Sequence, residues 1–515
     1  MGSGLAEAST EVENRNTALL VWLVAGAVAG LGTWILYEAM PGLGWGLWTI
    51  AATAAVVFIV KRTQRLPISL TASFAGVAVL VALAAALTAD PFMHAVIFLV
   101  VVLLLALTML IALDPRLDRV SASFVIFAPF AAGGLAIFES VTRALDASRL
   151  VRSPRARSVL RGVAITAPVV IVFALLLAGA DPVFDSWRST IEKILSSWAF
   201  LPRTLFFFAL LLIVLGTLGY VARGRAQPAG ANGAPSQTAG APVRWLGTTE
   251  RFILLASVAA LFWIFLAVQL SYLFGNLPAV AGSGITFAEY ARRGFGELSV
   301  VATCTVLLIV LSERYGQSGR RDALLRAVTL ALIAAVLLLL ASAFQRVTLY
   351  EAAYGFTTAR LYAQVYMAIV AVTLGALAIE TRGEIQPSRL FRRAALAALA
   401  AFIGLIYWNH EAWIARANIE RLATTGKLDV VYLTRDLSPN AIPAIVDKLP
   451  SLPEPARTQL LNAIKLRYEG RQRLRMRRWF EWNYGRAAAR NSLLRTGMSL
   501  EQLDSAAVHA PVVVR

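Results

Sequence analysis

Long apolar stretches alternate with short polar stretches along most of this chain. Several of the apolar stretches reach about 20 residues, the length that an α-helix needs to cross about 30 Å of hydrocarbon. The pattern predicts an all-α fold, a polytopic transmembrane helical bundle of 11–12 spans followed by a helical extramembrane tail. The expected spans lie at about 18–37, 45–60, 68–88, 92–113, 122–139, 161–180, 203–222, 250–274, 298–312, 323–344, 361–379 and 393–409.

Basic residues in the loops orient these spans, because cytoplasmic loops carry an excess of Lys and Arg. From residue 140 onward the basic loops alternate correctly between the two sides. Before it, three spans separate the basic loops 61–67 and 140–160, so one of the three should not cross. We expect that segment to be 122–139, re-entrant or shallow, because it contains Pro129 and a Gly-Gly pair. Eleven spans then put the N-terminus inside and the tail outside, and twelve spans are the alternative.

Composition shifts divide the chain into four parts. Residues 1–222 form a first helical block, 223–247 a flexible linker rich in Gly, Ala and Pro, and 248–409 a second helical block. The remainder, 410–515, has the polarity of an extramembrane helical domain. Within it we predict one long Arg-rich helix from about Pro455 to Leu494, whose cations and aromatic residues would favour an anionic membrane surface.

The overall composition supports a membrane location. The chain is 58% hydrophobic and 15% charged, a balance outside the range of ordinary soluble domains. Its net charge of +18 lies mainly in the loops and the tail, so we expect the lipid bilayer as partner and not nucleic acid. A single Cys and three scattered His residues argue against a disulfide framework or a metal centre, and no cofactor is indicated.

The most patterned polar stretch of the membrane part is residues 285–298, ITFAEYARRGFGEL. It reads as an amphipathic helix at the membrane interface that leads into the next span. Glu289, Arg293 and Glu297 recur at four-residue spacing and predict a ladder of ion pairs on one helix face, with Arg292 beside it. A salt-bridged re-entry helix and a site for an anionic group are both compatible with this pattern.

Two later polar stretches fall on the same expected outer side. The first, YGFTTARLY at residues 354–362, contains Tyr354 and Arg360. The second follows the last span and contains Asn409, Glu411, Arg416, Asn418 and Arg421. We expect the three stretches to meet at the outer mouth of the bundle. There they would form either a structural contact between bundle and tail or a binding site for anionic lipids, a lipid-linked substrate or a signal molecule.

These three stretches carry a resemblance to a known family. The segments FAEYARRGF (287–295), YGFTTARLY (354–362) and the IARxNI core within residues 409–421 resemble a bacterial multi-pass inner-membrane family of uncharacterised function, a domain of unknown function. The resemblance covers about residues 250–495. It implies a polytopic helical fold in the bacterial cytoplasmic membrane, and it implies no activity.

No enzyme signature occurs in the sequence: Walker A, a strand-bound GxGxxG, HExxH and GxSxG are all absent. We therefore expect a binding, sensing or assembly role, with the polar site at the outer mouth of the bundle. The alternative is a membrane enzyme or transporter that handles a lipid-linked or anionic substrate. An enzyme would need a titratable base near the arginines, for which Glu289, Glu351 and Glu411 are the candidates.

Overall fold

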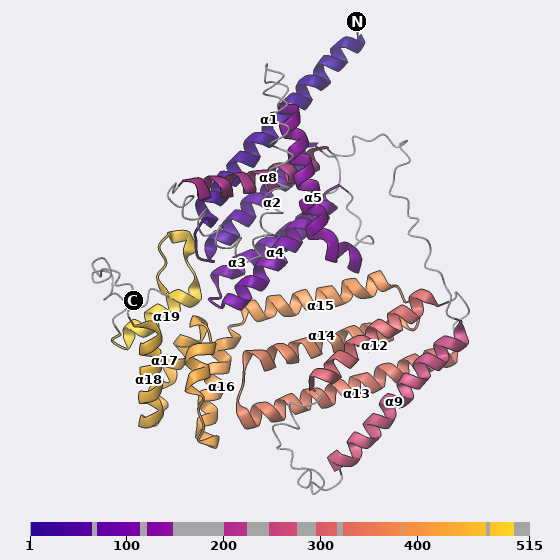
Figure 1. Cartoon of the computed structure of the whole chain (residues 1–515), viewed down its shortest axis with the longest axis vertical. Helices are drawn as coiled ribbons and strands as arrows, with labels where there is room; N and C mark the ends of the chain where they lie inside the picture. Colours follow the sequence, from indigo (N-terminus) through magenta and orange to yellow (C-terminus); the bar gives the residue numbers. More distant parts are fainter. Residues whose placement is uncertain are drawn as a thin grey trace, which may run out of the picture. The chain divides into compact units, whose positions relative to one another are not determined.

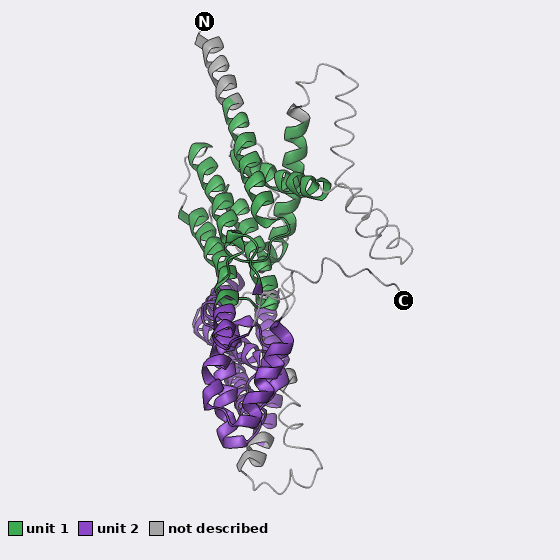
Figure 2. Cartoon of the chain, turned by 90° about the vertical axis from the view of Figure 1, so that its left-hand side faces the viewer, with its two compact units in different colours: residues 1–117, 123–228, 475–487 green, residues 118–122, 229–474, 488–515 purple. Residues whose placement is uncertain are grey.

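The structure, a computed structural model of the chain, describes residues 2–63, 69–113, 121–147, 200–223, 247–274, 295–316, 323–383, 385–469 and 474–498. Every secondary-structure element in these ranges is a helix (Figure 1). The chain divides into two compact units, coloured green and purple in Figure 2. Unit 1 comprises residues 1–117, 123–228 and 475–487, and unit 2 comprises 118–122, 229–474 and 488–515.

Unit 1 consists of apolar helices and a short segment of the tail, residues 475–487. Its elements are α1 (Gly2–Leu36), α2 (Leu43–Thr63), α3 (Ser69–Leu83), the 3₁₀ turn η1 (Ala84–Ala86), α4 (Pro91–Ile111), α5 (Ala122–Ala147), α8 (Leu201–Arg223) and the 3₁₀ turn η8 (Trp479–Glu481). Residues from α1, α2 and α8, among them Val21, Ile59 and Leu218, form one buried core together with Ala112, which follows α4. The start of α4 follows from its sequence, because Asp90 accepts a hydrogen bond from Phe92 N and Pro91 occupies the first helical position.

Unit 2 has a membrane part and an extramembrane part. The membrane part contains α9 (Thr248–Phe274), α12 (Phe295–Tyr315), α13 (Ala323–Tyr354), α14 (Thr358–Glu380) and α15 (Pro387–Tyr407). The extramembrane part contains α16 (His410–Thr425), the π-helical turn η4 (Tyr432–Asp436), η5 (Pro439–Ala441), α17 (Ile442–Lys448), η6 (Leu449–Ser451) and α18 (Glu454–Tyr468). One apolar core lies around Leu332 and Leu374 in the membrane part, and a second lies around Ile414 and Ile445 in the extramembrane part and also includes Leu361 of α14. A further helix, α19 (Tyr484–Arg495), begins in unit 1 and ends in unit 2.

The described helices confirm the multi-pass membrane character. Ten of them are long and apolar enough to cross a bilayer, and these ten coincide with ten of the twelve expected spans. The expected span 298–312 corresponds to a shorter apolar helix, Val300–Glu313. The span at 161–180 lies outside the described residues.

The structure corrects expectations about three individual segments. Residues 122–139 are not re-entrant, because α5 runs without a break through Pro129 and past the Gly-Gly pair; that this segment lies shallowly and does not cross stays a prediction. The loop expected at 345–360 is mostly helix, because α13 continues for three further turns after Phe344 and ends only at Gly355, which has a φ of +86°. Glycine adopts this left-handed conformation without strain and commonly ends helices.

The long helix expected from Pro455 to Leu494 was also wrong. Helix α18 ends at Tyr468, and residues 475–477 and 482–483, on either side of η8, are not helical. The intervening segment serves unit 1: Asn483 is fully buried and donates hydrogen bonds to the carbonyl oxygens of Ala85 (2.8 Å) and Thr88 (2.5 Å). A continuous helix could not place this side chain there, so tertiary contacts override the helical periodicity of the sequence.

Candidate functional site

The polar residues of the second and third sequence motifs meet within unit 2, between the α13–α14 junction and the extramembrane helices. We call this region, residues 350–364 together with residues 409–440, the tail contact. Both sides are built on capped helix ends. Thr357 caps α14 and accepts a hydrogen bond from Arg360 N, and Asn409 caps α16 and accepts one from Ala412 N. These caps fix where each helix begins and therefore which side chains face the contact.

Asn418 makes the most specific interaction of the tail contact. Its Oδ1 accepts a hydrogen bond from Phe356 N at 2.8 Å, and its Nδ2 donates one to Phe356 O at 2.8 Å. One side-chain amide thus satisfies both backbone groups of a residue that no helix includes. The approach is so close that a Cβ at Gly355 would lie 2.5 Å from Asn418 Oδ1. Glycine is therefore required here for its conformation and for its small size.

Two arginines donate hydrogen bonds to backbone carbonyl groups at the end of α13. Arg421 Nε donates to Ala352 O at 2.9 Å, and its Nη2 donates to Ala353 O. Arg360 Nη1 donates to Gly355 O, and the Arg360 guanidinium lies 4.2 Å from the centre of the Tyr350 ring. The last carbonyl groups of a helix have no partner inside it, and cations favour this negative end of the helix dipole. Both arginines therefore stabilise the helix end.

Glu411 is a buried acidic group of the extramembrane part, with 2% of its surface exposed. Its Oε1 accepts a hydrogen bond from Ser438 N at 2.8 Å, and its Oε2 accepts from Ser438 Oγ and from Asn440 Nδ2, the latter at 2.9 Å. Asn409 Nδ2 adds a hydrogen bond to Asn440 O at 3.1 Å. A buried carboxylate is tolerated where several donors surround it, so this network holds η5 against the start of α16.

Several participants had not been predicted from the sequence. His410 lies between two partners: Nδ1 is 3.2 Å from Leu405 O and Nε2 is 3.0 Å from Tyr362 Oη. If Nδ1 carries the proton and donates to the carbonyl, Nε2 accepts from the tyrosine. Tyr432 Oη accepts from Thr358 N at 2.8 Å, and burial raises the pKa of Tyr432 above its ordinary value. A single aromatic residue gives no sequence signal for such a contact. Asn409 and Ser438, by contrast, stand at the starts of helices, where polar side chains commonly make hydrogen bonds, and this position could have marked them as participants.

The sequence-predicted site residues divide into four groups. The structure brings together Arg360, Asn409, Glu411, Asn418 and Arg421 by the hydrogen bonds given above. Tyr354 lies in the last turn of α13 and is exposed, and its ring centre lies 4.8 Å from that of Tyr350, with the two rings tilted by 40°. Arg416 is exposed on α16, and its charge contributes to a lowered pKa at Glu420, after the larger effect of Lys448. Glu297 lies in the first turn of α12, while Glu289, Arg292 and Arg293 are outside the described residues.

The polar groups of the tail contact form hydrogen bonds mainly with one another. Glu351, one of the three candidate bases, is buried and accepts a hydrogen bond from Gln364 Nε2 at 2.8 Å. Glu411 is enclosed by three donors, and Glu289 lies outside the described residues. Within the described ranges, no group of three or more His, Cys, Asp or Glu side chains is placed to hold a metal ion. The arrangement therefore supports a rigid polar contact between bundle and tail.

Comparison with known proteins gives a family assignment. The family DUF4153, described as a domain of unknown function, matches residues 75–448. The match begins within α3, earlier than the start near residue 250 expected from the motifs, and it ends with α17, before α18. No curated protein and no solved structure matches the chain. Because the family match covers well over half of the sequence and includes the residues of the tail contact, this polytopic helical membrane protein belongs to the DUF4153 family.

Proposed function

We propose that this integral membrane protein has a binding and assembly role, in which the tail contact holds the extramembrane helices in a fixed position at the outer mouth of the bundle. The observation that carries the proposal is the use of polar groups in the tail contact. Asn418, Glu411 and Arg421 form hydrogen bonds with backbone and side-chain groups of the protein itself. Such groups stabilise a surface and leave little capacity for chemistry on a substrate.

The surface that this contact supports is suited to a membrane-proximal ligand. Trp408 and Trp413 are exposed, with their rings 5.7 Å apart, and Trp413 also packs edge-on against the Phe356 ring at 5.0 Å. Arg416 follows on the same helix three residues after Trp413 and makes no hydrogen bond with the described residues. Tryptophan favours the headgroup layer, and arginine binds phosphate groups. We propose that Trp408, Trp413 and Arg416 form the contact face for an anionic group at the outer surface.

A photo-crosslinking amino acid at position 417, directly beside Arg416, tests this proposal in intact membranes and leaves Arg416 in place. The matched control carries the same amino acid at position 456, where Ala456 is partly exposed like Ala417 but belongs to α18. We expect a specific adduct from position 417 and none from position 456, and the adduct mass identifies a lipid or a protein. Equal labelling from both positions, or no adduct from either, would contradict a binding face on α16.

A further inference from the structure

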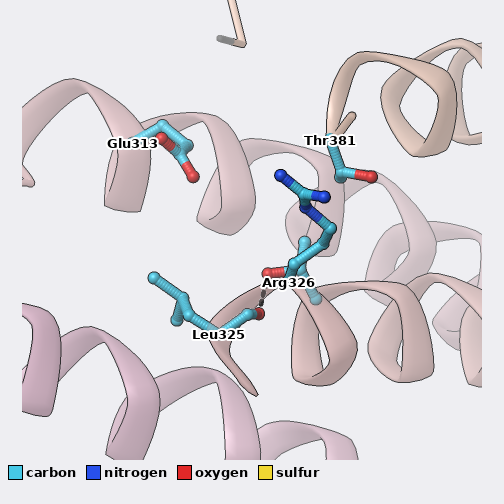
Figure 3. A pocket seen from close by; sticks show the side chains of 5 residues that line it. Glu313, Leu325, Arg326 and Thr381 are labelled. Atoms are coloured by element: carbon cyan, nitrogen blue, oxygen red, sulfur yellow. Dashed lines mark hydrogen bonds between the residues drawn. The ribbon is translucent and has the colours of Figure 1, made fainter. Parts of the chain in front are cut away.

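A second polar region lies in unit 2 at the end of the bundle where α9, α13 and α15 begin and where α12 and α14 end. Here Glu313, Leu325, Arg326, Thr329 and Thr381 line a pocket, which we call the arginine pocket (Figure 3). It has about 220 Å³ of empty space, part of which is open to solvent. Its enclosed part has room for about one water-sized group. The tail contact shares none of these residues.

The carboxylates at this end of the bundle are already neutralised. Arg251 Nη2 lies 2.5 Å from Glu313 Oε1. Glu380 Oε1 accepts a hydrogen bond from Arg389 Nε at 2.8 Å and from Arg393 Nη1 at 3.0 Å. Arg251 and Glu380 are each 4% exposed, so their charges are poorly screened by water. A negative group that entered the arginine pocket would therefore meet ion pairs and not isolated carboxylates.

Arg326 is an exposed cation at this end of the bundle. Its guanidinium has no hydrogen-bond or ion-pair partner among the described residues, and Figure 3 shows it between the helix that carries Glu313 and the segment that carries Thr381. Deeper in the same end, Arg251 Nε is buried without a hydrogen-bond acceptor in the described part of the chain. Among the described residues, this end of the bundle thus has arginine N–H groups for which no acceptor is present.

The other lining groups determine which ligand chemistry fits. Thr329 and Thr381 already donate their hydroxyl protons to Leu325 O and Ala378 O, so they offer no donors to a ligand. Among the lining groups, the donor that remains is the Arg326 guanidinium. A guanidinium matches the paired oxygens of a phosphate, and one phosphate oxygen suits the enclosed space.

We propose that the arginine pocket binds a phosphate group through Arg326. The phosphate could be carried by an anionic phospholipid or be free in solution. A lipid headgroup agrees with the sequence-based expectation that this end of the bundle faces the cytoplasm, since basic pockets between membrane helices on that side suit anionic headgroups. The site is distinct from the tail contact and does not depend on the function proposed for it.

Two variants of the full-length chain provide the test. Arg326→Gln removes the charge, and Arg382→Gln is the matched control. Arg382 is exposed, follows Thr381 directly, and does not line the pocket. In the lipid arm, each protein is incorporated into nanodiscs with equal amounts of phosphatidylglycerol and phosphatidylcholine, and native mass spectrometry counts the lipids that remain bound. In the phosphate arm, the delipidated protein in neutral detergent is titrated with inorganic phosphate against chloride at equal ionic strength, and thermal unfolding is followed.

We expect the parent protein and R382Q to retain phosphatidylglycerol or to be stabilised by phosphate, and R326Q to bind at least tenfold more weakly in the same arm. Loss in the lipid arm alone identifies a headgroup, and loss in the phosphate arm identifies the free ion. R326K, which keeps the charge but not the paired donors, should be intermediate, and it decides the question if R326Q cannot be purified. Equal behaviour of R326Q and R382Q in both arms, or an R326K protein that equals the parent, overturns the proposal.

Discussion

Replacing Asn418 by Ala should destabilise the extramembrane helices more than any other truncation of a single polar side chain on α16 apart from Glu411. The substitution removes two hydrogen bonds of 2.8 Å and leaves both Phe356 N and Phe356 O without their partner. A typical hydrogen bond contributes about 1 kcal/mol net, and an unpaired buried group costs about 1–3 kcal/mol. Since Asn418 is only half-buried, water recovers part of this loss, and we expect a decrease of about 2–3 kcal/mol in the free energy of unfolding.

The assay is chemical unfolding of the full-length protein in detergent micelles, followed by tryptophan fluorescence, because Trp408 and Trp413 lie beside the tail contact. Asn462→Ala serves as the control, since Asn462 is exposed on α18 and should cost less than about 0.5 kcal/mol. If N418A is no more destabilising than N462A, then the paired hydrogen bonds do not stabilise the contact and the reasoning is wrong.

Three further substitutions probe the same contact. Gly355→Ala should cost at least about 1–2 kcal/mol by chemical unfolding, because φ is +86° and the new Cβ would meet a side-chain oxygen at 2.5 Å; a neutral result would contradict the close approach. Glu411→Gln should cost about 2–4 kcal/mol, since it removes the charge and replaces one of the two acceptor oxygens by an NH₂ donor, and a loss below about 1 kcal/mol would argue against the network. Tyr432 has a raised pKa in the folded state, so its contribution to stability should be constant below about pH 10 and fall as the pH rises above that value. Tyr432→Phe should lose about 1 kcal/mol at neutral pH, because Thr358 N loses its acceptor, and should show a smaller alkaline decrease than the parent; identical alkaline curves would refute the assignment.

The membrane helices could be predicted because their signal is local. A run of about 20 apolar residues specifies a spanning helix whatever surrounds it, and ten described helices match the expected spans. The same reasoning was less accurate where polar residues interrupt a helix. Gln345 and Arg346 suggested that the span ended near residue 344, yet the helix continues to Tyr354 because no capping residue intervenes. Gly355, read as a helix-ending glycine, would have given the correct boundary.

The partners within the tail contact were harder to predict. The sequence indicated that residues 354–362 and 409–421 are polar segments on one side of the membrane, and the structure brings several of their side chains together. The sequence did not indicate that Asn418 pairs with the backbone of Phe356, because a backbone group carries no residue-specific signal. The arginine pocket was missed for a related reason. Arg326 was counted within a span, and a pocket made by helix ends far apart in sequence depends on how the helices pack.

Amide hydrogen exchange across residues 356–358 tests most directly whether the extramembrane helices are fixed to the bundle by the tail contact. Phe356 N donates to Asn418 Oδ1 and Thr358 N donates to Tyr432 Oη, whereas Thr357 N, between them, donates to none of the described residues. In the parent protein, residue-level exchange should therefore show slow exchange at Phe356 and Thr358 and fast exchange at Thr357. In the N418A/Y432F double variant, the exchange rates of Phe356 and Thr358 should rise at least tenfold, while the rate of Thr357 should not change. Equally fast exchange of all three amides in the parent protein would contradict the account.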